Sequence, residues 1–209
     1  MDLSKGEKIT VRNRSGEERE LLVRRCTPDD LDDVMALQER VVQKIASDMR
    51  AERLDPEVDD LKHFHGQDMR SAALFISDPI EETEYSIKND FSVAAFDGNQ
   101  MIGYSLMISG GIGEKNLGNV LGYDEERLSK CVNFEITFVD PDYRGFGLQR
   151  IFTEIRTQEA LRIGATEALT SVSPYNEKSI ANLRANGFVP VKEVVIYFGL
   201  TRLIMRKEL

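Results

Sequence analysis

Two glycines and a helix start stand together in one short segment, residues 139–149, whose sequence is VDPDYRGFGLQ. An apolar run at 131–138 precedes this segment, and a helical pattern over 148–163 follows it. Glycines let a backbone approach phosphates closely, and the first N–H groups of a helix have no acceptor inside the helix. The segment therefore predicts a cradle for a diphosphate, and with it a nucleotide-like cofactor. Taken alone, residues 144–147 could equally form an ordinary left-handed turn before a helix.

An acidic side chain inside the apolar strand is the second feature with chemical meaning. Glu135 is the charged residue of this run, and in strict alternation it shares a strand face with Thr137 and Val139. Burial at such a position raises the pKa of a carboxyl toward the range in which it can take a proton from an amine. The alternative is that Glu135 forms a structural ion pair with an arginine or lysine.

Two features downstream complete a recognisable combination. Asn176 opens the next short helix, and Asn186, Gly187 and Phe188 end that helix before a strand. Together with the glycine loop and Glu135, they resemble the GNAT superfamily of acyl-CoA-dependent N-acetyltransferases. The resemblance covers roughly residues 20–206, and its specific motifs lie within 134–188.

The loop itself matches the pattern of that superfamily with one departure. Arg144, Gly147 and the VDPDY lead fit the pattern, whereas Gln149 occupies the last position, where Gly or Ala is usual. The Gly-Leu-Gln ending resembles a common bacterial variant of the loop. A Rossmann site is a weaker match, because the chain has no GxGxxG motif opening an N-terminal βαβ unit.

The resemblance implies a fold and a cofactor. The fold would be mixed α/β (α+β), with a mostly antiparallel central sheet flanked by helices and a splayed strand pair at the CoA site. We expect one domain over 1–209, with 1–19 as an N-terminal hairpin extension, and acetyl-CoA as co-substrate without a metal. The backbone of Thr137, Phe138 and Val139 would meet the thioester and pantetheine arm, and Asn176, if it is more than a helix cap, would bind that arm. The loop residues expected around the diphosphate are Arg144, Gly145, Phe146, Gly147, Leu148, Gln149 and Arg150.

The implied reaction is direct attack of a primary amine on the thioester. Glu135 is the candidate general base. Many members of the superfamily protonate the leaving thiolate with a tyrosine in the short helix after Asn176. This chain has Leu183 at the position of that tyrosine, so the usual general acid is absent. Tyr175 is our candidate for this role and Tyr197 lies in a related position, although either could be a packed aromatic residue.

Two other functional classes stay open at this point. A non-catalytic CoA-binding sensor or interaction module is favoured by Leu183 and disfavoured by Glu135. A structural dimerisation protein would use the glycine loop only as a turn. For an enzyme, the acceptor would be a small-molecule or peptide amine, and acidic residues could attract a cationic one or simply form a solvated surface. The acidic residues in question are Glu81, Glu82, Glu84, Asp124, Glu125 and Glu126.

Composition excludes several other classes. The 209 residues suit one domain, and the net charge of −9 is unfavourable for non-specific nucleic-acid binding. No apolar stretch reaches membrane-spanning length and the N-terminus lacks a secretion signal, so we expect a cytoplasmic protein. A homodimer is a possible assembly. Cys26 and Cys131 are expected to be buried thiols, and the His63/His65 pair to lie on a solvated helix face.

The elements that must position these residues follow from periodicity and turn signals. We predict a hairpin over residues 9–26, a helix at 28–47, a helical region at 48–90 stopped near Asp78 and Pro79, and a loop at 110–130 that could act as a lid. The other predicted elements are a hairpin of strands 91–96 and 101–108, a short helix at 124–128, the strand 168–172, the helix 176–185, and terminal strands at 189–198 and 203–205.

Overall fold

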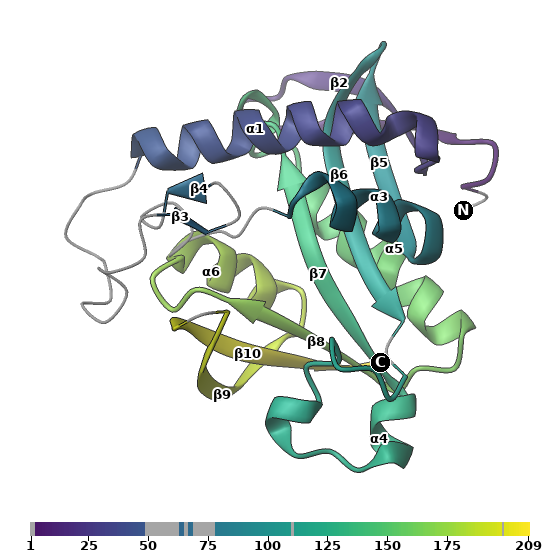
Figure 1. The fold of residues 1–209 in the computed structure, drawn as a ribbon. Helices are drawn as coiled ribbons and strands as arrows, with labels where there is room; N and C mark the ends of the chain where they lie inside the picture. Colours follow the sequence, from purple (N-terminus) through teal and green to yellow (C-terminus); the bar gives the residue numbers. More distant parts are fainter. Residues whose placement is uncertain (1–2, 49–62, 65–66, 69–77, 110, 198) are drawn as a thin grey trace.

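The computed structural model describes residues 3–48, 63–64, 67–68, 78–109, 111–197 and 199–209 (Figure 1). Its α-helices are α1 (Leu31–Asp48), α3 (Ile80–Asn89), α4 (Glu125–Ser129), α5 (Leu148–Arg162) and α6 (Glu177–Ala185). Single 3-10 turns are formed by η1 (Pro28–Asp30), η3 (Asn119–Leu121) and η4 (Pro141–Tyr143). The strands are β1 (Glu7–Arg12), β2 (Glu18–Arg25), β3 (His63–Phe64), β4 (Gln67–Asp68), β5 (Phe91–Asp97), β6 (Gln100–Ser109), β7 (Cys131–Val139), β8 (Glu167–Val172), β9 (Val189–Ile196) and β10 (Leu200–Glu208).

Eight of the described strands form one mixed sheet in the order β1-β2-β5-β6-β7-β8-β10-β9. Neighbouring strands are antiparallel except β7 and β8, which are parallel. A parallel pair needs a crossover connection, and α5 provides it. The expected fold class, a mostly antiparallel sheet flanked by helices, is therefore confirmed.

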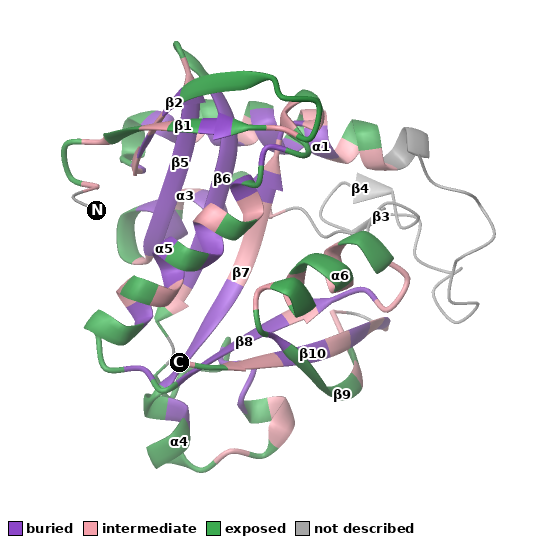
Figure 2. Ribbon diagram, turned by 180° about the vertical axis from the view of Figure 1, so that it is seen from behind, coloured by how far each residue is buried: buried purple, intermediate pink, exposed green. Residues whose placement is uncertain are grey.

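Helices cover both faces of this sheet (Figure 1). On one face, Val34 and Leu37 of α1 pack with Ile87 of α3 and with residues of β5, β6 and β7. On the other face, Phe152 and Ile155 of α5 belong to a second apolar cluster, against which residues of α6 also pack. Figure 2 shows the resulting pattern, with buried strands between helices whose outer surfaces are exposed. The central strands are buried along most of their length because both of their faces are covered.

Most elements lie where periodicity predicted them, including the N-terminal hairpin and the hairpin of β5 and β6. Cys26 and Cys131 are both free and buried, as expected. β10 is longer than the predicted strand 203–205, since it pairs with β8 on one side and β9 on the other.

The predicted helical region 48–90 is wrong in two respects. His63 lies in β3, which pairs with β4 in a separate small sheet, and not on a helix. Pro79 precedes a helix instead of following one, because α3 begins at Ile80. A proline excludes helical geometry for the residue before it but suits the first positions of a helix, so the same Asp78-Pro79 signal fits either end. The remaining residues of this region, 49–62, 65–66 and 69–77, lie outside the described part of the chain.

Candidate cofactor and catalytic site

β7 and β8 pair over only three residues and then diverge. The paired residues run from Cys131 opposite Glu167 to Asn133 opposite Leu169. Beyond this point β7 continues beside β6 to Val139, whereas β8 continues beside β10 to Val172. The two strands separate from a common starting edge (Figure 1). Among the described strands, none pairs with the β8-facing side of β7 after Asn133.

A β-bulge lies in β7 where the strands begin to separate. Ser105 of β6 faces Thr137, but Met107 faces Phe134, so Leu106 alone stands opposite both Glu135 and Ile136. A bulge bends its strand and increases the local twist. Strict alternation along β7 is therefore interrupted between Phe134 and Thr137. Phe134 and Ile136, which alternation would keep together, pack in different apolar clusters.

Glu135 occupies the bulge and is half-buried. Burial raises its pKa to about 7, and the negative charge of Asp78 adds to this rise. A hydrogen bond with the Asn133 side chain and the positive charges of Lys115 and Arg156 act in the opposite direction. No lysine or arginine of the described ranges forms a salt bridge with Glu135.

This raised pKa predicts how Glu135→Gln changes the free energy of unfolding with pH. The folded protein holds the Glu135 proton up to about pH 7, while the unfolded chain releases it near its ordinary value of 4.5. Between these values the folded state binds more protons, so wild-type stability falls as pH rises. Glutamine does not titrate, and the variant should therefore gain stability over the wild type across this window. Urea unfolding at about pH 5 and about pH 8 measures the difference; an equal difference at both pH values would contradict a buried carboxyl.

The loop after β7 is fixed by two contacts to neighbouring elements. Asp140 is buried, and its carboxylate accepts hydrogen bonds from the Asp142 amide (3.1 Å) and from Nε of Arg40 on α1 (2.8 Å). The Tyr143 hydroxyl donates to Asp97 at the β5–β6 turn (2.7 Å). The VDPDY lead thus places the glycine loop rigidly at the end of β7, as a preformed binding site requires.

The amides of residues 145–149 have no acceptor among the described residues. They precede or begin α5, where the helix leaves its first N–H groups unpaired. Gly145 (φ 89°) and Gly147 (φ 79°) are both in the left-handed region, and a Cβ at either position would project into open space. The Arg150 amide, by contrast, donates to the Gly147 carbonyl (3.0 Å). Of the residues expected around the diphosphate, Arg150 is thus one whose amide already has an acceptor within the protein. The loop is a left-handed turn and also presents free N–H donors.

α6 forms the second wall beside this loop. Asn176 is its N-cap, and its side-chain oxygen accepts from the Ser179 amide (3.1 Å). The Asn182 amide group donates to the side-chain oxygen of Gln149, which links α6 to the start of α5. The capping role of Asn176 is therefore established, and its contact with a pantetheine arm stays a prediction.

Three residues bear on the missing general acid. Leu183 packs against the apolar cluster beneath α6. Tyr175 is half-buried in the turn before α6, and its amide donates to Ser173 Oγ (3.3 Å). Tyr197, between β9 and β10, has a φ of 51° and places its hydroxyl 3.4 Å from Ser171 Oγ on β8. Burial, followed by the charge of Glu135, raises the pKa of Tyr197 to about 12, so it keeps its proton at neutral pH.

Comparison with known proteins defines the fold. No family model and no curated protein sequence matches the chain. Among solved structures, an acetyltransferase of the GNAT family from Streptococcus pneumoniae is similar at 17% identity with a TM-score of 0.59, covering 91% of this chain and 100% of its own. This chain has the GNAT fold. The Salmonella typhimurium protein yncA, solved with its cofactor acetyl-CoA, aligns at 17% identity and a TM-score of 0.55 over 90% of this chain and 93% of its own. The PaiA N-acetyltransferase from Thermoplasma acidophilum, in complex with coenzyme A, aligns at 13% identity and a TM-score of 0.59 over 90% of this chain and 99% of its own.

The GNAT fold brings several residues to the site that sequence reasoning did not single out. Asn133 is buried, accepts from the Leu117 amide (3.2 Å) and donates to the Lys115 carbonyl (2.7 Å). It thereby anchors the 110–130 segment to β7 close to Glu135, while the lid role of that segment stays a prediction. Arg156 of α5 lies beneath the bulge. In the sequence, an asparagine or arginine that will be buried cannot be distinguished from one on the surface. Only its burial in the folded protein shows that it belongs to the site.

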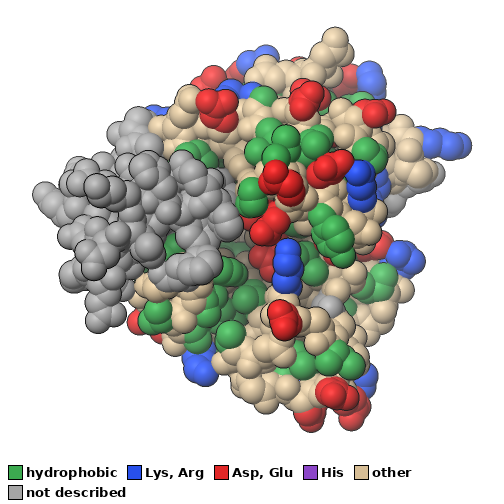
Figure 3. Space-filling view, viewed as in Figure 1, with side chains coloured by type: hydrophobic (Ala, Val, Ile, Leu, Met, Phe, Trp, Pro, Cys, Tyr) green, Lys and Arg blue, Asp and Glu red, His purple; other side chains and the backbone are tan. Residues whose placement is uncertain are grey.

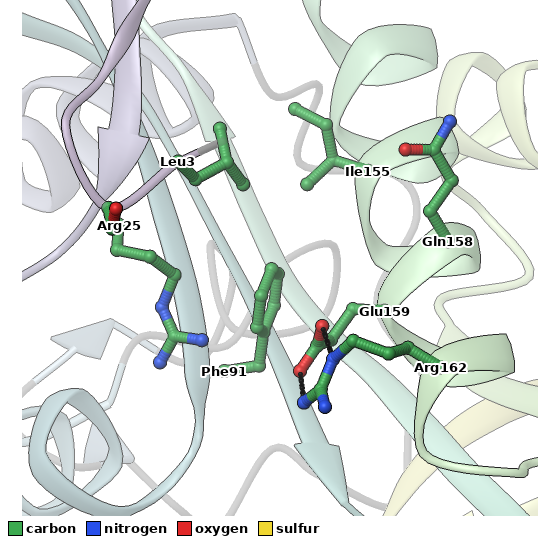
Figure 4. A pocket seen from close by; sticks show the side chains of 8 residues that line it. Leu3, Arg25, Phe91, Ile155, Gln158, Glu159 and Arg162 are labelled. Atoms are coloured by element: carbon green, nitrogen blue, oxygen red, sulfur yellow. Dashed lines mark hydrogen bonds and ion pairs between the residues drawn. The ribbon is translucent and has the colours of Figure 1, made fainter. Parts of the chain in front are cut away.

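Other surfaces of this GNAT-fold chain lie apart from the splayed strands. A pocket of about 540 Å³ lies at the far end of α5, where Glu159 and Arg162 pair with each other (Figure 4). None of the predicted site residues lines it. Within the described ranges, no group of three or more His, Cys, Asp and Glu side chains is arranged to hold a metal ion. None of the helices described is both long and apolar enough to cross a membrane.

Proposed function

We propose that this protein is an N-acetyltransferase that transfers an acetyl group from acetyl-CoA to a primary amine by direct attack. The observation that supports it most is the juxtaposition of free loop amides at 145–149, diverging strands, and a half-buried carboxylate at Glu135. Free amides at a helix start suit a diphosphate, and their glycines leave room for it. The structural neighbours that contain acetyl-CoA or coenzyme A support the same ligand.

Each predicted residue then has a defined task. The amides of the loop hold the diphosphate, and the backbone of β7 from Thr137 to Val139, beyond its pairing with β8, meets the thioester and the pantetheine arm. Acetyl-CoA supplies an activated acetyl group. Glu135 accepts the proton that the amine must lose, and its pKa of about 7 suits this exchange near neutral pH. Tyr175 and Tyr197 are the candidates for returning a proton, and the charge of Glu135 acts on Tyr197.

A cationic amine is the acceptor that the charge of the surface favours. Figure 3 shows Asp and Glu side chains gathered over the region of α3 on one face of the molecule. Glu81 and Glu82 of α3 are exposed, and Lys115 Nζ lies 3.4 Å from Glu82. Negative potential at a cleft raises the local concentration of a cation. We therefore propose a small-molecule or peptide amine as partner.

Release of free thiol from acetyl-CoA over a panel of primary amines tests this function. The panel should contain a polyamine, an amino acid, a peptide with a free N-terminus and an aminoglycoside. We expect at least one amine to release CoA stoichiometrically with an acetylated product seen by mass spectrometry. CoA binding without thiol release for any amine would favour the alternative, a non-catalytic CoA-binding sensor or interaction module. Absence of CoA binding at millimolar concentration would contradict both.

A further inference from the structure

A buried arginine contacts the strand at the point where the bulge disturbs it. Arg156 of α5 is 3% exposed, and its Nη1 donates to the Leu106 carbonyl at 3.0 Å. Leu106 is the β6 residue that faces both Glu135 and Ile136. The sheet ladder is interrupted at a bulge, and Arg156 supplies a hydrogen bond at this interruption from the neighbouring helix.

Two further contacts hold the guanidinium in place. Its central carbon lies 4.4 Å from the centre of the ring of Phe134, the residue just before the bulge. Its Nε donates to the Phe152 carbonyl one turn earlier in α5 (3.4 Å). The planar guanidinium group of arginine can stack on a ring and donate to a carbonyl at the same time, whereas the ammonium group of lysine cannot do both. The bulge is thus tied to α5 on one side, and on the other the buried Ser105 hydroxyl contacts the Ile136 carbonyl (3.3 Å).

The charge of Arg156 is also linked to that of Glu135. Burial lowers the pKa of Arg156 to about 9, and the negative charge of Glu135 opposes this effect. Reciprocally, the positive charge of Arg156 lowers the pKa of Glu135. A buried cation is costly without a nearby anion, and Glu135 partly compensates it.

We propose that Arg156 is a positioning residue for Glu135: it fixes the bulge that presents the carboxylate to the splayed strands, and its positive charge favours the ionised form of that carboxylate. The catalytic meaning of this arrangement rests on the proposed acetyltransferase function. Arg156 acts through the backbone of the bulge and through charge, and it needs no contact with a substrate.

Charged and polar groups on several neighbouring elements affect the pKa of the Glu135 carboxylate. Its titration must therefore be interpreted with all of these groups in mind. Asp78, before α3, favours the protonated form, whereas Lys115 of the loop before β7 and Arg156 of α5 favour the ionised form. Among the described residues, Asn133 on the same strand and Tyr197 from the β9–β10 turn also interact with it.

An NMR titration of carboxyl-labelled glutamate measures the charge link without any acceptor. Glu135→Gln assigns the signal, because this variant lacks it. We expect the Glu135 midpoint to move to higher pH in Arg156→Met and to stay in place in Arg156→Lys, which keeps the charge. Arg162→Met, on the exposed end of the same helix, is the matched control and should leave the midpoint unchanged. An unchanged midpoint in Arg156→Met would overturn the charge link.

A reciprocal measurement applies if Arg156→Met does not fold. In the wild type, the Nε–H resonance of Arg156 should shift with pH near 7, and this shift should be lost in Glu135→Gln. Persistence of the shift in Glu135→Gln would overturn the link.

Turnover with the amine found in the panel tests the positioning itself. Arg156→Lys should lower kcat by about 10–100-fold, with the KM for acetyl-CoA nearly unchanged, because a small displacement of a base is costly. Its pH midpoint should stay that of the wild type. Full turnover in Arg156→Lys would refute the proposal that the guanidinium group of Arg156 positions Glu135. If no amine is acetylated, the titrations still decide the charge link, so failure of the function and failure of this inference give different results.

Discussion

Replacing Gly147 with tryptophan is expected to abolish CoA binding, with Kd rising about 100-fold or more, which corresponds to about 2.8 kcal/mol. Gly147 has a φ of 79°, and a Cβ there projects into open space beside the free amides of the loop. A large side chain would fill this space and keep a diphosphate from the N–H groups. Isothermal titration calorimetry with CoA measures the loss.

Gly164→Trp is the matched control for this experiment. Gly164 follows the other end of α5, also has a positive φ (83°), and a Cβ there also meets open space. The control carries the same backbone strain but lies away from the proposed cradle, so its CoA affinity should match the wild type. Equal affinity for CoA in Gly147→Trp and Gly164→Trp would mean that the diphosphate does not bind at the start of α5.

Glu135→Gln is expected to lower kcat by about 10²–10⁴-fold while the affinity for CoA changes little. Glutamine has nearly the same shape but cannot accept the proton of the amine. In the wild type, kcat/KM should rise with pH through about 7, because the ionised carboxylate is the active form and its pKa is about 7. The variant should lose this rise.

Two measurements separate the base role from a structural one. CoA titration of Glu135→Gln should give wild-type affinity, which shows that the loop and the splayed strands are intact. Turnover of the variant that equals the wild type at neutral and alkaline pH would remove Glu135 from the role of base. Tyr175 and Tyr197 then become the groups to examine next.

The conformation of the glycine loop after β7 could be predicted from the sequence because its determinants are local. Gly145 and Gly147 have the positive φ values that glycine favours, and the helix start follows directly in the chain. The capping role of Asn176 is local as well. The splayed pair was expected only through the resemblance to GNAT proteins, since strand pairing joins residues far apart in the sequence.

The geometry at Glu135 could not be predicted, since it depends on a register between two strands. Alternation assumes one residue of β7 for each residue of β6, but Leu106 faces two. The partner of that bulge, Arg156, comes from a helix that follows β7, and its burial is a tertiary property. The end assigned to the Asp78-Pro79 signal was wrong for a related reason: a proline next to a helix marks a boundary without telling its direction.

By itself, the sequence determined that one chain segment offers glycines and unpaired helix amides to a phosphate, and that an ionisable side chain lies in the adjoining apolar strand. Both follow from properties of neighbouring residues. Only the tertiary structure decided that the two strands separate after Asn133, that a bulge lies at Glu135, and that the buried Arg156 contacts the strand opposite this bulge. These features depend on pairing and packing between distant segments, where the burial that shifts a pKa is created.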